Sequence, residues 1–249
     1  MAKRKKKKVK KSSSSKLLLA LVLVVGIGAF VYFWYKSSKT EIHTHAEFLE
    51  QFPEGFKSIG IDISHHQGEI DWEELLVNKH YDTIIDFVYC KVSEGSDHLD
   101  TQWEKNRIAL NEHGMMNGAY HYFNPKSSPR PQAKLFLNNY MYRSIDLPPV
   151  LDVEDEGFSD SDLIAKIRIW GDEVYKKIGV RPIIYTSLSF YETKFRGKLP
   201  EYSFWLAAYS RKPQYLDDPQ VIHWQFSETG RIPIIKYSID LNVSKNSFD

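Results

Sequence analysis

Two acidic side chains, two positions apart, give the strongest chemical signal in this sequence. Asp152 and Glu154 follow the apolar run 148–151, which is typical of a short buried strand. Strand side chains alternate between faces, so both carboxyls would point the same way, with Cα atoms about 6.5 Å apart. Two carboxyls that close repel each other, which can raise one pKa and separate a general acid from an anionic partner. The alternative is a strand that runs into an acidic loop, since Asp155 and Glu156 follow.

The order of the surrounding elements predicts an α/β barrel. Strand-like stretches are expected at 59–64, 84–92, 115–123, 149–153, 181–186, 204–209, 221–226 and 237–241. Helix-like stretches are expected at 71–80, 100–113, 131–143 and 160–178, with a short one near 190–195. Helices between the early strands favour a parallel, TIM-like (β/α) barrel, irregular and with reduced helices in its C-terminal half. A doubly wound open sheet is the alternative, but the sequence has no glycine-rich phosphate loop.

The ends of the expected strands carry acids and aromatic residues. In a (β/α) barrel, functional groups gather at the C-terminal ends of the strands. Besides the two acids above, the acids at these ends are Asp62, Glu94 and Asp240. The aromatic and amide residues there are Tyr120, Tyr122, Tyr185, Trp205, Tyr209, Trp224 and Gln225. Carboxylates with aromatic faces are the usual lining of a carbohydrate groove, so the sequence predicts a glycan-binding site.

Metal chemistry is not expected. His65, His66, His121 and His223 are available, but none has convincing ligand spacing. A metal-dependent deacetylase is therefore a weaker hypothesis, and we expect neither metal nor cofactor.

The N-terminus has the pattern of a membrane anchor. Residues 1–16 contain nine Lys/Arg and no acid, and residues 17–35 are uncharged and mostly apolar. Nineteen such residues are about the length that a helix needs to cross a bilayer. The positive-inside rule then places residues 1–16 in the cytoplasm. A retained anchor is favoured over a cleaved signal peptide, whose apolar region is normally shorter, and residues 36–57 are interpreted as a juxtamembrane linker.

Charge and cysteine content narrow the remaining options. Without residues 1–16, Lys+Arg falls to 24 against 32 Asp+Glu, a formal net charge of −8. An acidic outer portion argues against nucleic acid as a partner. Cys90 is the only cysteine, so no intrachain disulfide can form, and its apolar neighbours predict a buried, inert thiol.

From residue 58 to about 242, the sequence resembles glycoside hydrolase family 25, the N-acetylmuramidase (lysozyme) family. The blocks that carry the resemblance occur in the family's order. They are G-I-D-I-S-H-H-Q-G at 60–68, F-V-Y-C-K-V-S-E-G at 87–95, G-A-Y-H-Y-F at 118–123, D-V-E at 152–154, I-Y-T at 184–186, W-L-A-A-Y at 205–209, W-Q-F at 224–226 and D-L-N at 240–242.

The resemblance implies cleavage of the β-1,4 bond between N-acetylmuramic acid and N-acetylglucosamine in peptidoglycan strands. It assigns Glu154 as general acid and Asp152 as its assistant, which in a substrate-assisted mechanism orients the 2-acetamido group. Inversion, with Asp62 activating a water, is the competing mechanism; otherwise Asp62 and Asp240 position the sugar. A non-catalytic glycan-binding protein on the same fold is the second hypothesis.

Resemblance and anchor together give an expectation for the whole chain. We expect a monomeric, single-pass protein of the bacterial cytoplasmic membrane, held through residues 17–35. Its hydrolase domain, residues 58–249, would lie on the periplasmic or extracytoplasmic side.

Overall fold

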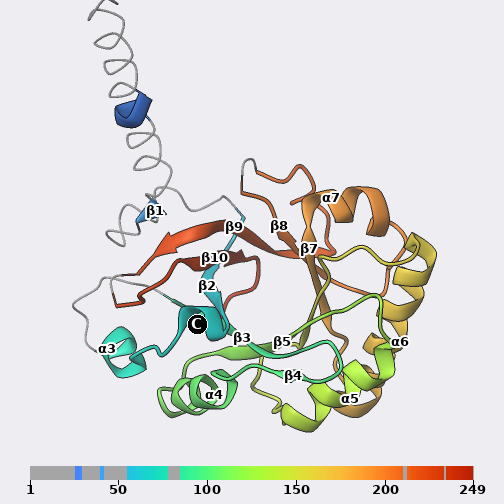
Figure 1. The fold of residues 1–249 in the computed structure, drawn as a ribbon, viewed down its shortest axis with the longest axis horizontal. Coiled ribbons are helices and arrows are strands. Elements are labelled where there is room, and N and C mark those ends of the chain that lie inside the picture. Colours follow the sequence, from blue (N-terminus) through green and yellow to red (C-terminus); the bar gives the residue numbers. More distant parts are fainter. Residues whose placement is uncertain are drawn as a thin grey trace, which may run out of the picture. The chain divides into compact units, whose positions relative to one another are not determined.

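A closed barrel of eight strands forms the centre of the fold (Figure 1). The computed structural model describes residues 26–29, 40–41, 55–77, 85–209, 212–232 and 234–248. The chain divides into two units, residues 1–39 and residues 40–249, and the barrel belongs to the second. Its strands are β2 (Ser58–Ile63), β3 (Phe87–Glu94), β5 (Asn117–Tyr122), β6 (Val150–Asp152), β7 (Ile183–Ser187), β8 (Phe204–Ala207), β9 (Val221–Arg231) and β10 (Ile239–Ser244).

The barrel is mixed rather than wholly parallel. Each step from β2 to β9, through β3, β5, β6, β7 and β8, joins parallel neighbours. The last strand, β10, is antiparallel to both β9 and β2 and closes the ring. The expectation of a parallel barrel was therefore wrong for β10. Only a short connection separates β9 from β10, and such a connection suits an antiparallel pair, whereas a parallel pair needs a long crossover.

Two short strands lie outside the ring. Strand β4 (His98–Leu99) pairs with β3. Strand β1 (Thr40–Glu41) pairs with β9, so two residues of the predicted linker have backbone partners in the sheet.

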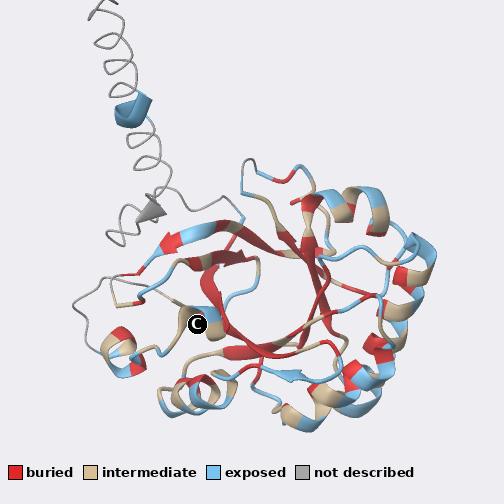
Figure 2. Cartoon of the chain, viewed as in Figure 1, coloured by how far each residue is buried: buried red, intermediate tan, exposed pale blue. Residues whose placement is uncertain are grey.

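The helices lie around the outside of the barrel (Figures 1 and 2). They are α3 (Trp72–Leu76), α4 (Trp103–Glu112), α5 (Pro129–Asn139) and α6 (Asp160–Ile178). Helix α6 has the predicted bounds because its ends are well marked. Ser159 Oγ accepts the backbone N–H of Asp162 at 3.1 Å, and Gly179 ends the helix with φ of 83°. Among the described residues after β7, the helical elements are α7 (Leu188–Phe190) and the π-helical turn η2 (Tyr191–Phe195), which confirms the reduced helices.

The barrel strands are buried along most of their length (Figure 2). Their side chains alternate between an outer layer and the barrel interior. Outward residues pack against the helices, and inward residues include large aromatic rings. Gly60 and Gly118 make room for two of these rings. A Cβ at Gly60 would lie 2.4 Å from the Phe87 ring, and one at Gly118 would lie 2.4 Å from the Tyr89 ring. One end of the interior is thus filled, and the C-terminal ends of the parallel strands are left for a cavity.

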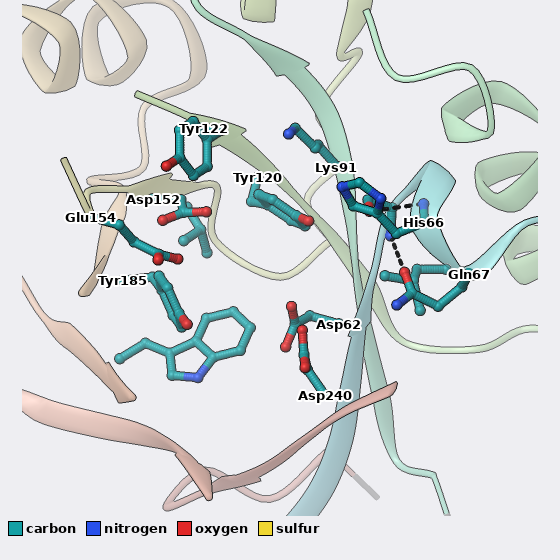
Figure 3. Close-up of a pocket in the computed structure, with 14 residues that line it drawn as sticks. Asp62, His66, Gln67, Lys91, Tyr120, Tyr122, Asp152, Glu154, Tyr185 and Asp240 are labelled. Atoms are coloured by element: carbon teal, nitrogen blue, oxygen red, sulfur yellow. Dashed lines mark hydrogen bonds between the residues drawn. The ribbon is translucent and has the colours of Figure 1, made fainter. Parts of the chain in front are cut away.

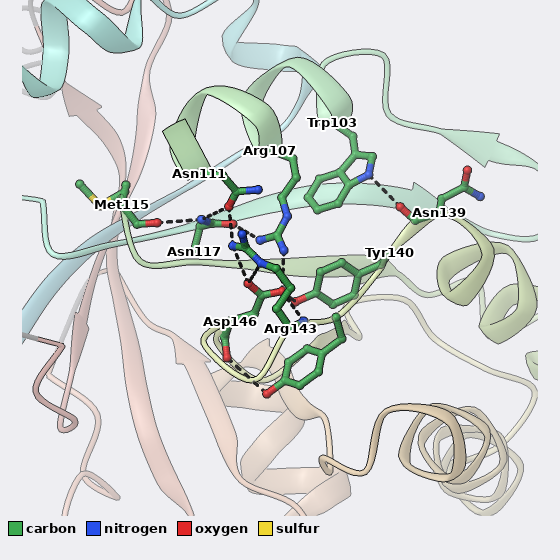
Figure 4. A network of polar contacts seen from close by, with 10 residues as sticks. Trp103, Arg107, Asn111, Met115, Asn117, Asn139, Tyr140, Arg143 and Asp146 are labelled. Carbon is green, nitrogen blue, oxygen red and sulfur yellow. Dashed lines mark hydrogen bonds and ion pairs between the residues drawn. The ribbon is translucent and has the colours of Figure 1, made fainter. Parts of the chain in front are cut away.

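A buried ion-pair network supports the segment that leads into β6 (Figure 4). Asp146 Oδ2 accepts Arg107 Nη2 at 2.5 Å, and Asp146 Oδ1 accepts Arg143 Nε at 3.0 Å. Arg107 also donates to Asn117 Oδ1 at the start of β5. Because a buried carboxylate is costly unless it is paired, this network ties α4 and β5 to the segment before β6, the strand that carries Asp152.

The predicted membrane span lies outside the described residues except for 26–29, which are helical and exposed. Within the described ranges, no helix combines the length and the hydropathy needed to cross a bilayer.

Candidate active site

A cavity of about 200 Å³ opens at the C-terminal ends of the parallel strands (Figure 3). Residues from β2, β3, β5, β6, β7, β8 and β10 reach it, together with the turn after β2. In chain order, its lining is Asp62, Ile63, Ser64, His66, Gln67, Lys91, Tyr120, Tyr122, Val150, Asp152, Glu154, Tyr185, Trp205 and Asp240. Eight of the twelve predicted site residues are in this set, and two more, Gln225 and Glu94, hydrogen-bond to a member of it.

Asp152 and Glu154 lie side by side on one wall of the cavity (Figure 3). Burial, and next the charge of Glu154, raise the pKa of Asp152 well above its usual range. Partial burial of its carboxyl also raises the pKa of Glu154, against a hydrogen bond from Asp152. The sequence suggested that Asp152 stays ionised; because Asp152 is the more deeply buried of the two, burial favours the protonated form of its carboxyl in the free protein. Within the described chain, its Oδ1 is buried without a hydrogen-bond partner.

Asp62 and Asp240 form a second carboxyl pair that faces the first across the cavity (Figure 3). Asp62 Oδ2 accepts Gln225 Nε2 and Asn242 Nδ2, both at 2.8 Å. Burial raises the pKa of Asp62, while these hydrogen bonds oppose the rise. Burial and the charge of Asp62 raise the pKa of Asp240 to about 9. Asp240 is therefore protonated at neutral pH, and the two amide donors favour the ionised form of Asp62.

Aromatic residues join the two pairs into one lining. Tyr120 lies between them (Figure 3), and burial raises its pKa and that of Tyr185 well above the usual range, so both hydroxyls stay neutral. Tyr185 donates to Gln225 Oε1 at 2.7 Å, and the indole N–H of Trp205 donates to Asn242 Oδ1 at 3.0 Å. These contacts leave ring faces and hydroxyl groups in a cavity that also holds four carboxyls.

Lys91 is a lining residue that the sequence reasoning missed. Its buried ammonium lies 2.6 Å from Glu94 Oε2 and 4.9 Å from the centre of the Tyr122 ring. Strand alternation could have found it, because Tyr89 and Lys91 share the inward face of β3. Glu94 itself does not line the cavity; a bulge in β3 between Lys91 and Ser93 changes the register before it.

The other missed residues come from the turn after β2 and from β10. His66 and Gln67 lie in η1 (His65–Gln67), where Gln67 accepts the backbone N–H of Ser64 at 2.9 Å. Asn242 follows Asp240 by two positions and shares its strand. The family motifs contain all three residues, but their types alone do not suggest acid–base chemistry.

Two predicted site residues lie elsewhere. Trp224 faces the outer core, where it contacts Phe56 and donates to the carbonyl of Ala208 at 2.9 Å. Alternation along β9 turns His223 and Gln225 inward and so turns Trp224 away, a position that does not favour the predicted sugar contact. Tyr209 is half exposed beside the cavity, and its hydroxyl donates to Gln225 Oε1 at 2.5 Å.

The histidines do not converge on a metal site. His121 is buried between Ser93 and Gln132, and His223 is buried among aromatic rings in the barrel. The described part of the chain contains no group of three or more His, Cys, Asp or Glu side chains that could hold a metal ion.

Sequence comparison finds related proteins that cover most of this chain. Residues 61–235 match Glycosyl hydrolases family 25. The uncharacterized protein YegX of Escherichia coli K12 is 34% identical over 197 residues, which cover 79% of this chain and 72% of YegX. Lysozyme M1 of Streptomyces globisporus is 29% identical over 203 residues, which cover 74% of this chain and 66% of that lysozyme.

Solved structures share the barrel. A family 25 glycosyl hydrolase from Bacillus anthracis superimposes with a TM-score of 0.69 at 27% identity, over 79% of this chain and 92% of that one. A bacterial lysozyme from Streptomyces coelicolor superimposes with a TM-score of 0.66 at 27% identity, over 77% of this chain and 93% of that one.

Proposed function

Since the chain belongs to glycosyl hydrolase family 25, we propose that it cleaves the β-1,4 bond between N-acetylmuramic acid and N-acetylglucosamine in peptidoglycan. One observation carries the proposal: two carboxyl pairs face each other across a cavity lined by tyrosines and a tryptophan (Figure 3). The names of two relatives, lysozyme M1 and the Streptomyces coelicolor lysozyme, support the same substrate.

Glu154 is the proposed general acid. It is the exposed member of its pair, so its carboxyl can reach the oxygen of a glycan strand lying in the cavity. Burial raises its pKa, which favours the protonated form that a general acid needs. The proton then passes from Glu154 to the leaving oxygen as the glycosidic bond breaks.

Asp152 is the proposed partner of the sugar's 2-acetamido group. Its unpartnered Oδ1 fits the acetamide N–H, because a buried acceptor gains most from a donor when it has none in the free protein. Accepting that N–H stabilises the ionised form of Asp152, so the proton that the pair shares moves to Glu154. The acetamide oxygen, held by this contact, then attacks the anomeric carbon.

Inversion through Asp62 is less favoured by the geometry. A general base must hold a water molecule as well as accept its proton. Asp62 already accepts two amide donors and faces the carboxyl of Asp240. These contacts leave little capacity for a water, which supports retention through the acetamide.

Glu154→Gln tests the general acid. We expect kcat on purified peptidoglycan to fall about 10²–10⁴-fold, because the amide cannot protonate the leaving oxygen. Release of reducing ends measures the rate, mass spectrometry identifies the sugar at the new reducing end, and early proton NMR spectra give its anomer.

A matched control uses the same loop. Glu156 is exposed, pairs with Lys194 at 3.0 Å and does not line the cavity, so Glu156→Gln should keep the wild-type rate. Equal rates for Glu154→Gln and wild type would show that another group is the acid. N-acetylglucosamine at the new reducing end would contradict the proposed bond, and an α product would reassign Asp62 as the base. Glycan binding without cleavage would favour a binding protein.

The proposed location is the membrane surface. Nine cations in residues 1–16 followed by the apolar run 17–35 support a single-pass anchor, with residues 58–249 outside the cytoplasm. An anchored muramidase would act on peptidoglycan close to the membrane.

A further inference from the structure

Two amide side chains converge on one carboxylate oxygen at the cavity. Gln225 on β9 and Asn242 on β10 both donate to Asp62 Oδ2 at 2.8 Å. Both amides are fully buried, and neither of them lines the cavity. Because neither amide reaches the cavity, each acts on the reaction through the side chains that it holds there, of which Asp62 is the one that both share.

The orientation of each amide is set by a further contact. The indole N–H of Trp205 can only donate, so it requires the oxygen of Asn242 on its side and turns Asn242 Nδ2 toward Asp62. Gln225 Oε1 lies 2.7 Å from the hydroxyl of Tyr185 and 2.5 Å from that of Tyr209. With the oxygen between two hydroxyls, the N–H donors of Gln225 point to the carboxylate.

We propose that Gln225 and Asn242 are positioning residues, which hold Asp62 in one orientation as a fixed carboxylate opposite the Asp152–Glu154 pair. The inference rests on the proposed glycosidase function. A fixed negative charge at this place stabilises the positive charge that develops on the sugar ring and the acetamide, and preorganised groups do so without reorganisation during the reaction.

The surroundings of Asp62 show why the amides are needed. The groups whose charge or proton affects Asp62, or is affected by it, are Asp152, Glu154, Asp240, Tyr120, Tyr185, Tyr209 and the buried thiol of Cys90. Three of them are acids, which disfavour a further negative charge. The two amides are the side-chain N–H donors to Asp62 within the described chain, and their hydrogen bonds lower its pKa against the effect of burial. Loss of either amide would raise the pKa of Asp62 and favour its protonated form.

The test compares pH profiles of kcat/KM on peptidoglycan for the full-length chain and for Gln225→Met. Methionine has a similar length but no N–H to donate. We expect kcat to fall about tenfold or more while KM changes little, because a hydrogen bond to a charged group is worth about 1.5–3 kcal/mol. The acidic limb of the profile should move toward higher pH by about one unit, since the pKa of Asp62 rises when a donor is lost. Gln225→Glu, which keeps an oxygen for the tyrosines, should shift the limb in the same direction.

Gln220 provides a matched control. It donates two hydrogen bonds through Nε2, to the backbone carbonyls of Leu199 and Tyr202 at 3.0 and 2.7 Å, and does not line the cavity. Gln220→Met should lower the melting temperature and leave the pH profile unchanged. This separates a loss of stability from a loss of positioning.

A double-mutant cycle with Asp62→Asn completes the test. If Gln225 acts through Asp62, then Gln225→Met should lower kcat much less in the Asp62→Asn background than in wild type. An equal loss in both backgrounds, with an unmoved acidic limb, would overturn the positioning role and leave the glycosidase function standing. Absence of cleavage by the wild-type chain at every pH would instead remove the proposed function, and the positioning role with it.

Discussion

At the scale of single residues, the main property of the site is the raised pKa of its carboxyl groups. Four carboxyls share one cavity, and burial raises the pKa of each of them. A raised pKa helps an acid catalyst. It also means that ionising the carboxyl is less favourable in the folded protein than in the unfolded chain, so the free energy of unfolding falls as the pH rises. The carboxyls to which we assign the proposed reaction therefore make the fold less stable at neutral pH than at acidic pH.

Asp240 shows this most directly. Its pKa is about 9 in the folded protein against 3.8 in a free side chain, so its contribution to the free energy of unfolding is present at acidic pH and is lost as the pH rises from about 4 to 9. In Asp240→Asn, an amide replaces the protonated acid and can still donate to Asp62. We expect the variant to melt at a higher temperature than wild type at pH 8, by about 2–4 °C for each kcal/mol recovered, with no gain near pH 4.

Thermal unfolding across this pH range checks the prediction, with Asp217→Asn, an exposed position that does not line the cavity, as the control for removal of a charge. If the melting temperature of Asp240→Asn differs from that of wild type by the same amount at every pH, then Asp240 is not protonated in the folded protein.

At the scale of elements, capping residues decide where a helix starts, and the alternation of strand residues decides which side chains face the cavity and which face the outer core. Period-two alternation sends Asp62, Tyr120, Asp152 and Tyr185 into the cavity, while their neighbours enter the outer core. Helix α6 follows β6 in the chain and packs against α5 on the outside of the barrel (Figure 1). The two helices cover the outer side of the barrel near β6, the strand that carries Asp152. The first turn of α6 depends on the hydroxyl of Ser159.

Loss of this cap should be measurable. Ser159→Ala removes the acceptor for the backbone N–H of Asp162, and we expect the free energy of unfolding to fall by about 1 kcal/mol. Ser128→Ala is the matched control, because Ser128 has the same position at the start of α5 but makes no side-chain capping bond. Chemical denaturation of both variants measures the difference; equal losses would show that the hydroxyl bond is not what stabilises α6.

At the scale of the whole molecule, charge divides the chain into two unlike parts. The first 16 residues carry nine positive charges, and the rest carries a net charge of −8. Membranes with anionic headgroups attract basic segments, whereas an acidic domain has no such attraction. This division supports an anchor at the N-terminus and a hydrolase domain that does not itself bind the membrane surface.

Cell fractionation tests the anchor. We expect the full-length chain in the membrane fraction, resistant to high salt and released by detergent. Val24→Arg combined with Val25→Arg should weaken retention, because each arginine at the centre of a span costs about 2.5–3.5 kcal/mol for insertion. Replacing Val9 with Arg, outside the apolar run, is the control. A wild-type chain that salt alone releases would contradict a transmembrane anchor.

Much of the fold and site was predictable from the residues themselves. The eight strands, the bounds of α6 and the inward-facing acids follow from periodicity, capping residues and glycine positions, which act between near neighbours in the chain. The motifs that identified the family are also short stretches of neighbouring residues. They lie at the strand ends, where the side chains that line the cavity are found. Asp152 is the last residue of β6 and Glu154 lies two positions beyond the strand, and both line the cavity.

Tertiary structure decided what depends on residues far apart in sequence. The direction of β10 follows from closing the ring between β9 and β2, and the ionised state of Asp62 depends on Gln225 and Asn242, 163 and 180 residues away. The raised pKa of Asp152 depends on how deeply the barrel buries its carboxyl. Burial and long-range hydrogen bonds set these properties because they change the free energy of a charge, which no local pattern in the sequence records.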